Sequence, residues 1–282
     1  MSRLSVAIVG GGIGGLALAN FLLQADVRVT IFERRPSFDG PDGGAVMLRA
    51  EGLEVLDDLG MFVLGKSASE VGDEQWIVRD ALMQLLSSRV KARAEVQVMM
   101  EVQDVQERDQ KIEVHYRPFL RLKAGQWVRN EDPHVESRAF DIVVGCDGNA
   151  PSSVTCRKLV GEASQAKPVS LLALQALAPR STSGSPDTQS TVLMNGPVVQ
   201  GRLDLSGAAT ADQYEWDLCF LLVHLPDPMS SFPPQKEWAG RMEQLIASVE
   251  NTSLRNRAQD VLDRAKTGGR LHAWVPFQTQ TL

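Results

Sequence analysis

The sequence predicts an α/β fold that opens with a dinucleotide-binding βαβ unit, and three observations predict it. An unbroken apolar run, residues 6–9, is typical of a strand buried on both faces of a parallel sheet. The glycine-rich stretch GGGIGG follows at once and leads into an apolar helical segment. A second strand pattern, residues 27–32, ends at Glu33, 23 positions after Gly10. This distance is close to the one at which an acid meets the ribose of a bound dinucleotide.

The glycine stretch contains the pattern G-x-G-x-x-G, formed by Gly10, Gly12 and Gly15. The first glycine permits the tight turn, the second lets a pyrophosphate approach the backbone, and the third lets helix and strand pack closely. The helix would then present unpaired N–H groups to the phosphates. A signal peptide is the competing interpretation of an apolar start. The glycines interrupt its hydrophobic segment and a single arginine precedes it, so we prefer the dinucleotide fold.

Glu33 restricts the nucleotide that this loop would hold. Its carboxylate accepts hydrogen bonds from a free 2′-hydroxyl and repels a 2′-phosphate, so NADP is disfavoured at this site. The next two residues, Arg34 and Arg35, would soften that repulsion, although arginines there are also typical of a solvated turn. The pattern by itself leaves FAD and NAD as alternatives.

Composition excludes several other classes of protein. The chain has 282 residues, 43% of them hydrophobic, and a net charge of −6. An acidic chain without a basic, aromatic-rich run argues against a nucleic-acid partner. No apolar run approaches the length of a membrane span. The three cysteines have no metal-ligand spacing and fit a reduced, cytoplasmic setting. The sequence does not specify an oligomeric state.

Two further stretches follow the second strand. The first is a glycine-rich turn, GPDGGAVML, which contains Gly44 and Ala45 and leads to a helix that ends at Gly60. The second is WIVRDALMQLLSSRV, which we expect to be one helix with the pattern R-x-x-L-x-x-x-L. Its arginine, Arg79, would lie near the helix start. Taken alone, Arg79 is typical of a surface residue.

The middle of the chain contains a strand-rich region. Residues 95–117 alternate between polar and apolar and predict a short antiparallel meander. Residues 140–144 predict another buried parallel strand, which runs into Asp147. Open α/β sheets bind ligands at the carboxyl ends of their central strands, so Asp147 is a candidate ligand-binding residue. The alternative is a turn-forming Asp-Gly pair. Farther on, residues 214–225 predict a strand and residues 238–250 a helix.

Together these pieces resemble the FAD-dependent aromatic monooxygenases of the para-hydroxybenzoate hydroxylase type. Four stretches in order carry the resemblance: GGGIGG with its acid, GGAVML with LEVLDDLG, the R-x-x-L-x-x-x-L helix, and VVGCDG followed by Ser-Val and an arginine. It covers residues 4–161 well and the remainder loosely. It implies a Rossmann-like FAD-binding domain of the glutathione-reductase type over residues 1–165, with part of the substrate sheet inserted. It also implies a second, α+β substrate domain over residues 166–282. This second domain would be discontinuous in sequence, because part of its sheet is inserted in the first.

The resemblance also implies site residues and an activity. The glycines would cradle the pyrophosphate of FAD, the acid would hold the adenosine ribose, the second glycine turn would pass close to the flavin, and the arginine helix and the Asp-Gly motif would complete the site. NAD(P)H would supply hydride, and O2 would supply one oxygen atom to a small aromatic or phenolic substrate. No histidine has a motif around it, so the catalytic residue stays unassigned. The implied cofactor-binding residues are Gly10, Gly12, Gly15, Glu33, Arg34, Gly44, Ala45, Arg79 and Asp147.

The chain departs from this pattern in three places. It has no late Gly-Asp stretch of the GDAAH type, Arg79 follows Gly60 by only 19 positions, and Arg157 follows Asp147 by ten. We therefore expect the C-terminal residues, WVPFQTQTL, to end at an open sheet edge. The alternative function is a catalytically impaired fragment or pseudoenzyme that retains a dinucleotide-binding fold. A flavin-dependent halogenase is disfavoured, since AWVP lacks the first tryptophan of W-x-W-x-I-P.

Overall fold

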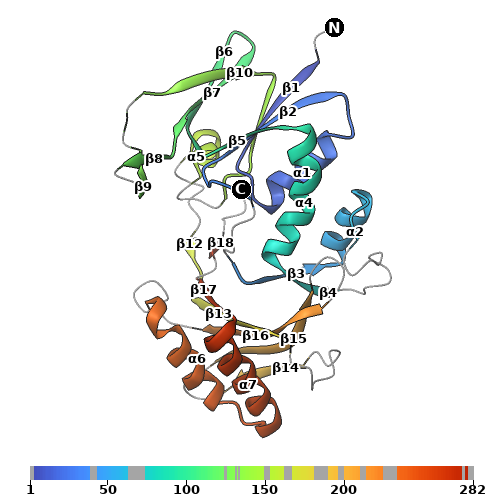
Figure 1. Cartoon of the computed structure of the whole chain (residues 1–282), viewed down its shortest axis with the longest axis vertical. Helices are drawn as coiled ribbons and strands as arrows, with labels where there is room; N and C mark the ends of the chain where they lie inside the picture. Colours follow the sequence, from blue (N-terminus) through green and yellow to red (C-terminus); the bar gives the residue numbers. More distant parts are fainter. Residues whose placement is uncertain are drawn as a thin grey trace. The chain divides into compact units, whose positions relative to one another are not determined.

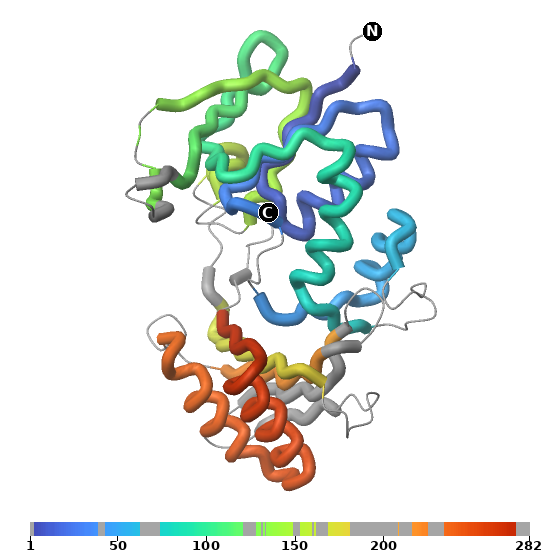
Figure 2. The backbone as a smooth tube through the Cα atoms, viewed as in Figure 1, coloured from blue at the N-terminus to red at the C-terminus, as the bar shows by residue number. Residues whose placement is uncertain are grey.

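The computed structural model describes most of the chain and divides it into two compact units. The first unit comprises residues 1–40, 83–166 and 279–282, and the second comprises residues 41–82 and 167–278. Figure 2 allows the chain to be followed from one unit into the other. The described residues are 3–38, 43–62, 74–123, 126–130, 132, 134–148, 153–161, 167–180, 190–195, 200–209, 214–224, 234–274 and 277–278.

The first unit contains a four-stranded parallel sheet in the order β11-β1-β2-β5 (Figure 1). Val6 of β1 lies opposite Val29 of β2 and Ile142 of β11, so the three strands that the sequence predicts are neighbours in this sheet. Helix α1 (Ile13–Leu22) follows β1 directly, so the predicted βαβ unit is present. The strands are β1 (Leu4–Val9), β2 (Val27–Glu33), β5 (Glu95–Val98) and β11 (Ile142–Gly145).

A second, antiparallel sheet in this unit has the order β10-β7-β6. Its apolar face packs into one cluster with the parallel sheet, and Phe32 and Phe140 meet edge to face at 6.0 Å. A short hairpin, helix α5 (Val154–Val160) and the larger part of helix α4 (Arg79–Arg93) complete the described elements of the unit. The strands are β6 (Met100–Arg108), β7 (Lys111–Pro118), β10 (Glu136–Phe140), β8 (Leu120–Lys123) and β9 (Gln126–Arg129).

Three of the predicted element assignments are wrong, and the first two concern strands: the meander at residues 95–117 and the buried strand at residues 140–144. β5 pairs parallel with β2 and is not part of the meander. The stretch 140–144 is divided, since Phe140 ends β10 and β11 begins at Ile142. β11 is the edge strand of the described sheet, and Ile142 is 41% exposed, so the strand is not buried. An apolar run reports hydrophobicity and does not reveal whether a neighbouring strand covers each edge.

The third correction concerns the helix expected over residues 76–90. Residues 74–78 instead form strand β4 (Glu74–Val78), and helix α4 begins at Arg79 and ends at Arg93. The reason is local, because Trp-Ile-Val combines an aromatic with two β-branched residues, which favour a strand. Arg79 is therefore the first residue of its helix, which confirms the prediction that it lies near the helix start.

The second unit is built on a seven-stranded sheet in the order β17-β13-β16-β15-β4-β3, with β14 paired to β15. Most of its strands come from residues after 168, while β3 and β4 come from before residue 147, so this unit is discontinuous as predicted. The strands are β3 (Ala45–Arg49), β4, β13 (Leu171–Pro179), β14 (Ser190–Asn195), β15 (Gln200–Ala209), β16 (Tyr214–His224) and β17 (Arg270–Trp274). Shorter elements of the unit are η2 (Gln235–Glu237) and the pair β12 (Lys167–Pro168) and β18 (Phe277–Gln278).

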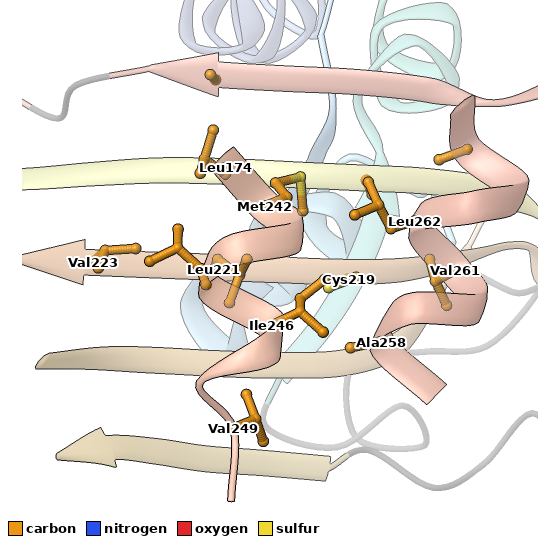
Figure 3. Close-up of a cluster of buried hydrophobic side chains, with 14 of the residues drawn as sticks. Leu174, Cys219, Leu221, Val223, Met242, Ile246, Val249, Ala258, Val261 and Leu262 are labelled. Atoms are coloured by element: carbon orange, nitrogen blue, oxygen red, sulfur yellow. The ribbon is translucent and has the colours of Figure 1, made fainter. Parts of the chain in front are cut away.

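Two helices, α6 (Trp238–Ala247) and α7 (Thr252–Gly268), cover one face of this sheet. Figure 3 shows side chains of both helices and of the strands in one buried cluster, which includes Ile246 of α6, Leu262 of α7 and Leu221 of β16. Burial of such apolar side chains is the main stabilising term of a domain core. No described helix of the chain is long and apolar enough to cross a membrane.

Helix α2 (Ala50–Asp58) ends as the sequence predicted. Gly60 has a left-handed φ of 63°, and its N–H donates to the carbonyl oxygen of Asp57 at 2.7 Å. The next amide, of Met61, donates to the carbonyl of Leu56 at 2.8 Å. These two bonds satisfy the last carbonyls of the helix, and the positive φ explains the glycine.

Candidate functional site

The glycine loop between β1 and α1 shows a separate role for each glycine. A Cβ at Gly10 would lie 2.2 Å from the carbonyl oxygen of Cys146, and its φ is +102°. A Cβ at Gly15 would lie 2.0 Å from the carbonyl oxygen of Gly10. A Cβ at Gly12, in contrast, would meet no atom within 4 Å. The first and third glycines therefore permit close packing, and the second leaves open space in which a ligand can approach the backbone.

Helix α1 begins next to that open space. Gly12 is its N-cap residue, no side chain caps the first amides, and the first turn carries no acid. The N-terminus of a helix has a partial positive charge and outward-facing N–H groups, which together favour an anion. The described loop thus has the geometry and the charge of a phosphate site.

Glu33 lies at the end of β2, only 5% exposed, and supports the same loop. Its Oε2 accepts the N–H of Gly11 at 2.8 Å, and its Oε1 accepts the N–H and Nε–H of Arg35 at 2.8 and 3.0 Å. A carboxylate has about four acceptor positions, so one position on Oε2 remains. Glu33 therefore braces the loop and still has one acceptor for a ligand hydroxyl. The sequence indicated the acid but not these two partners.

The loop opens onto a cavity of about 210 Å³ within the first unit. Five of the predicted residues line it: Gly10, Gly12, Glu33, Arg34 and Asp147. Gly15 lies beneath the loop and packs against it. The structure therefore brings together all the predicted residues that this unit contributes.

Asp147 has a role at this cavity that the sequence did not indicate. Its Oδ2 accepts the N–H groups of Val154 and Thr155 at 2.6 and 3.2 Å, and its Oδ1 accepts the hydroxyls of Ser153 and Thr155 at 2.7 and 2.5 Å. The carboxylate thus stabilises the start of α5, where a negative charge is favourable. Beside it, burial and the Asp147 charge raise the pKa of the Cys146 thiol.

The remaining predicted residues, Gly44, Ala45 and Arg79, meet in the second unit. The N–H of Arg79, at the start of α4, donates to the carbonyl oxygen of Gly44 at 3.0 Å. Ala45 is held through both its backbone groups by the side chain of Gln175, which the sequence analysis did not single out. The signal that could have indicated Gln175 is one amide in the apolar strand LLALQALAP.

The histidines and acids give no second site among the described residues. None of the four histidines lines the cavity, and His224 and His272 belong to the other unit. No described group of histidine, cysteine or acidic side chains has the arrangement of a metal site.

Comparison with known proteins begins with the loop itself. Residues 8–40 match the family described as NAD(P)-binding Rossmann-like domain. A thiamine thiazole synthase from Methanothermobacter thermautotrophicus is 33% identical over 119 residues, which cover 39% of this chain and 44% of the relative. An FAD-dependent monooxygenase of Penicillium shearii, esdpE, is 40% identical over 60 residues, covering 21% of this chain and 12% of the relative. The chain thus spans less than half the length of these curated relatives.

Solved structures extend the likeness to the whole chain. Klebsiella pneumoniae HpxO, complexed with FAD and uric acid, is similar over 99% of this chain and 69% of its own, with a TM-score of 0.71 and 14% identity. This chain shares the fold of that FAD-containing protein. Aklavinone-11 hydroxylase with FAD and aklavinone has a TM-score of 0.62 at 18% identity, over 99% of this chain and 55% of its own. A flavin-dependent halogenase, CmlS, has a TM-score of 0.60 at 18% identity, over 100% of this chain and 51% of its own. The predicted α/β fold with its second, discontinuous domain is confirmed.

Proposed function

We propose that the first unit binds FAD at the glycine loop and that the protein is an FAD- and NAD(P)H-dependent monooxygenase. One observation carries the proposal: the open side of Gly12, the uncapped start of α1 and the remaining acceptor of Glu33 all meet at one cavity. A dinucleotide offers a pyrophosphate and a ribose hydroxyl at that spacing. The residues present therefore fit the adenosine diphosphate half of FAD.

Each group of the site has a definable task. The amides at the start of α1 would hold the pyrophosphate, Oε2 of Glu33 would accept a ribose hydroxyl, and Arg34 at the cavity would balance negative charge. Bound FAD would supply redox chemistry with NAD(P)H and O2 that no side chain of the protein can perform. Gly44, Ala45 and Arg79 would serve the flavin side of the cofactor. Asp147 would act indirectly, by holding the backbone of the loop that follows β11.

The substrate is proposed to be a small aromatic or phenolic compound. HpxO and aklavinone-11 hydroxylase, whose structures contain uric acid and aklavinone, support a small ring compound. We assign FAD binding to residues 1–165, with part of the substrate sheet inserted, and substrate binding to residues 166–282. A cytoplasmic location fits the cysteine content.

A second candidate is a dinucleotide-binding protein that does not hydroxylate. The match to thiamine thiazole synthase favours it, since that match is longer than the match to the Penicillium shearii monooxygenase. The two candidates share the nucleotide site and differ in turnover. Consumption of NAD(P)H with stoichiometric hydroxylated product supports the monooxygenase, whereas FAD binding without such turnover, across a panel of phenols, supports the second candidate.

The nucleotide site is tested most sharply at Gly12. Its backbone is extended, with φ −74° and ψ −174°, and the space around its Cβ is empty, so Gly12→Asp fits the fold. Aspartate is also a favoured N-cap and would place its own carboxylate on the free amides. We expect Gly12→Asp to lose FAD binding, measured by calorimetric titration, with unchanged or higher thermal stability. Gly14→Ala is the matched control, because its Cβ would also meet nothing within 4 Å. Full FAD affinity in Gly12→Asp would contradict the assignment.

A further inference from the structure

We infer that the first unit has a second binding site, a basic cavity at the amino ends of its parallel strands, which takes a small ligand with two or more phosphate or carboxylate groups. The cavity has a volume of about 600 Å³ and is lined by four arginines, Arg3, Arg28, Arg93 and Arg138. All the described residues that line it belong to the first unit. We call it the arginine cavity, and its proposed ligand is independent of FAD.

The arginine cavity is separate from the nucleotide cavity. Val9, at the carboxyl end of β1, lines the nucleotide cavity, whereas Ser5, near the start of the same strand, lines the arginine cavity. On β2, Glu33 lines the first cavity and Arg28 the second. Figure 1 shows the start of β1 beside the N-terminus. No described residue lines both cavities, so a ligand in one does not occupy the other.

The sheet brings the lining side chains together from distant parts of the chain. Side chains alternate along β2, so Arg28 and Thr30 lie on the same face of the parallel sheet. Glu95 of β5 lies opposite Thr30 and shares that face. Arg138 of β10 reaches the same place, because its Nη1 donates to both carboxylate oxygens of Glu95 at 2.7 Å. Folding therefore places guanidinium groups from β2 and β10 at one cavity.

Positive charge exceeds negative charge at this cavity, although the whole chain has a net charge of −6. Glu95 is the one acid among the described residues that line it. Arg3 is paired with Asp26 at 2.7 Å. The guanidinium of Arg28 has no hydrogen bond or ion pair with any described residue. Like charges that are gathered in this way repel one another, and a bound anion would relieve the repulsion.

Two other negative features adjoin the cavity, and each has its own cation. The carboxyl ends of α1 and α4 carry partial negative charge. There Nη2 of Arg93 donates to the carbonyl oxygen of Leu23 at 2.7 Å. Asp141, which accepts the hydroxyl of Ser5, is paired with Lys111. Neither feature therefore cancels the charge of the other guanidinium groups.

The free donors determine the class of ligand. A guanidinium presents its N–H groups in a fixed fork that matches the oxygens of a phosphate or a carboxylate. Glu95 takes only Nη1 of Arg138, so Nε and Nη2 have no partner among the described residues. The same guanidinium lies 5.1 Å from the centre of the Phe140 ring, which restrains it. Since donors come from more than one arginine, a ligand with several anionic groups gains more than a singly charged one. The volume is that of a small-molecule pocket.

The experiment is a calorimetric titration of the full chain with inorganic triphosphate and, separately, with citrate, at one fixed ionic strength. Arg28→Gln should weaken binding roughly fivefold, the upper end of what an exposed charge pair contributes. Glu95→Gln should tighten binding by roughly the same factor, because it removes the carboxylate that competes for Arg138. The matched controls are Arg157→Gln, an exposed arginine on α5, and Glu54→Gln, an exposed acid on α2; neither residue lines the cavity.

Opposite responses to the two substitutions keep the test decisive. Arg28→Gln breaks no described side-chain contact, so its unfolding midpoint should match wild type, and a gain of affinity in Glu95→Gln cannot come from misfolding. Whichever probe binds more tightly identifies the ligand as a phosphate or a carboxylate compound. The inference is overturned if neither probe binds wild type, or if Arg28→Gln changes affinity no more than Arg157→Gln does. Binding that Gly12→Asp abolishes and Arg28→Gln leaves unchanged would place the anion at the glycine loop and would also overturn it.

Discussion

Glu33→Ala tests the ribose assignment through the acceptor positions of one carboxylate. Three of about four positions are filled by the N–H of Gly11 and two N–H groups of Arg35, which leaves one on Oε2. One hydrogen bond to a charged group contributes about 1.5–3 kcal/mol. The variant should therefore bind FAD about 10- to 150-fold more weakly, at a factor of ten for each 1.4 kcal/mol.

The assay is a calorimetric titration of folded apoprotein with FAD and, separately, with ADP. Both ligands carry the adenosine ribose, so both should lose the same factor. Glu107→Ala is the control, because Glu107 is an exposed acid on β6 of the same unit. Glu33→Ala also removes the bonds that brace the loop, so measurements are made below the unfolding transition of each variant. A folded Glu33→Ala protein with wild-type affinity for both ligands would refute the ribose role.

Three further predictions concern stability. Gly15→Ala should lower the free energy of unfolding by about 1–3 kcal/mol or more, since its Cβ would collide with a backbone carbonyl, whereas Gly14→Ala should be neutral or stabilising. Urea titration measures both variants, and equal effects would contradict the close packing at Gly15. Lys111 and Ser5 hold the pKa of the Asp141 carboxyl well below its usual 3.8, so its contribution is present above that pH and is lost as pH falls below it. Asp141→Asn should therefore flatten the pH dependence of unfolding in acid, and an unchanged slope would count against the pair. Leu262→Ala, in the fully buried cluster under α6 and α7, should cost about 2–5 kcal/mol in thermal or urea unfolding; a cost below 1 kcal/mol would show that this core is loosely packed.

Long-range contacts account for most differences between expectation and structure; the exception is strand β4, whose cause is the local Trp-Ile-Val sequence. The pairing of β5 with β2, the exposed edge at β11 and the partners of Asp147 all depend on which segments meet after folding. A periodic pattern within ten residues carries no information on which distant segments come into contact. The expected open edge at the end of the chain concerns residues 274–282, of which 275–276 and 279–282 lie outside the described residues. The short distance between Gly60 and Arg79 includes residues 63–73, which also lie outside them.

The sequence by itself determined the βαβ unit, the close packing at Gly10 and Gly15, the acid at the end of β2 and the helix end at Gly60. Each depends on backbone conformation or strand periodicity, which neighbouring residues control. The tertiary structure alone decided that Gln175 would bond Ala45, 130 residues away. Two polar groups so far apart in the chain become partners only when folding removes both from water and leaves each without another bond. This requirement, that buried polar groups be paired, acts on the folded molecule and leaves no local pattern beyond a lone amide in an apolar strand.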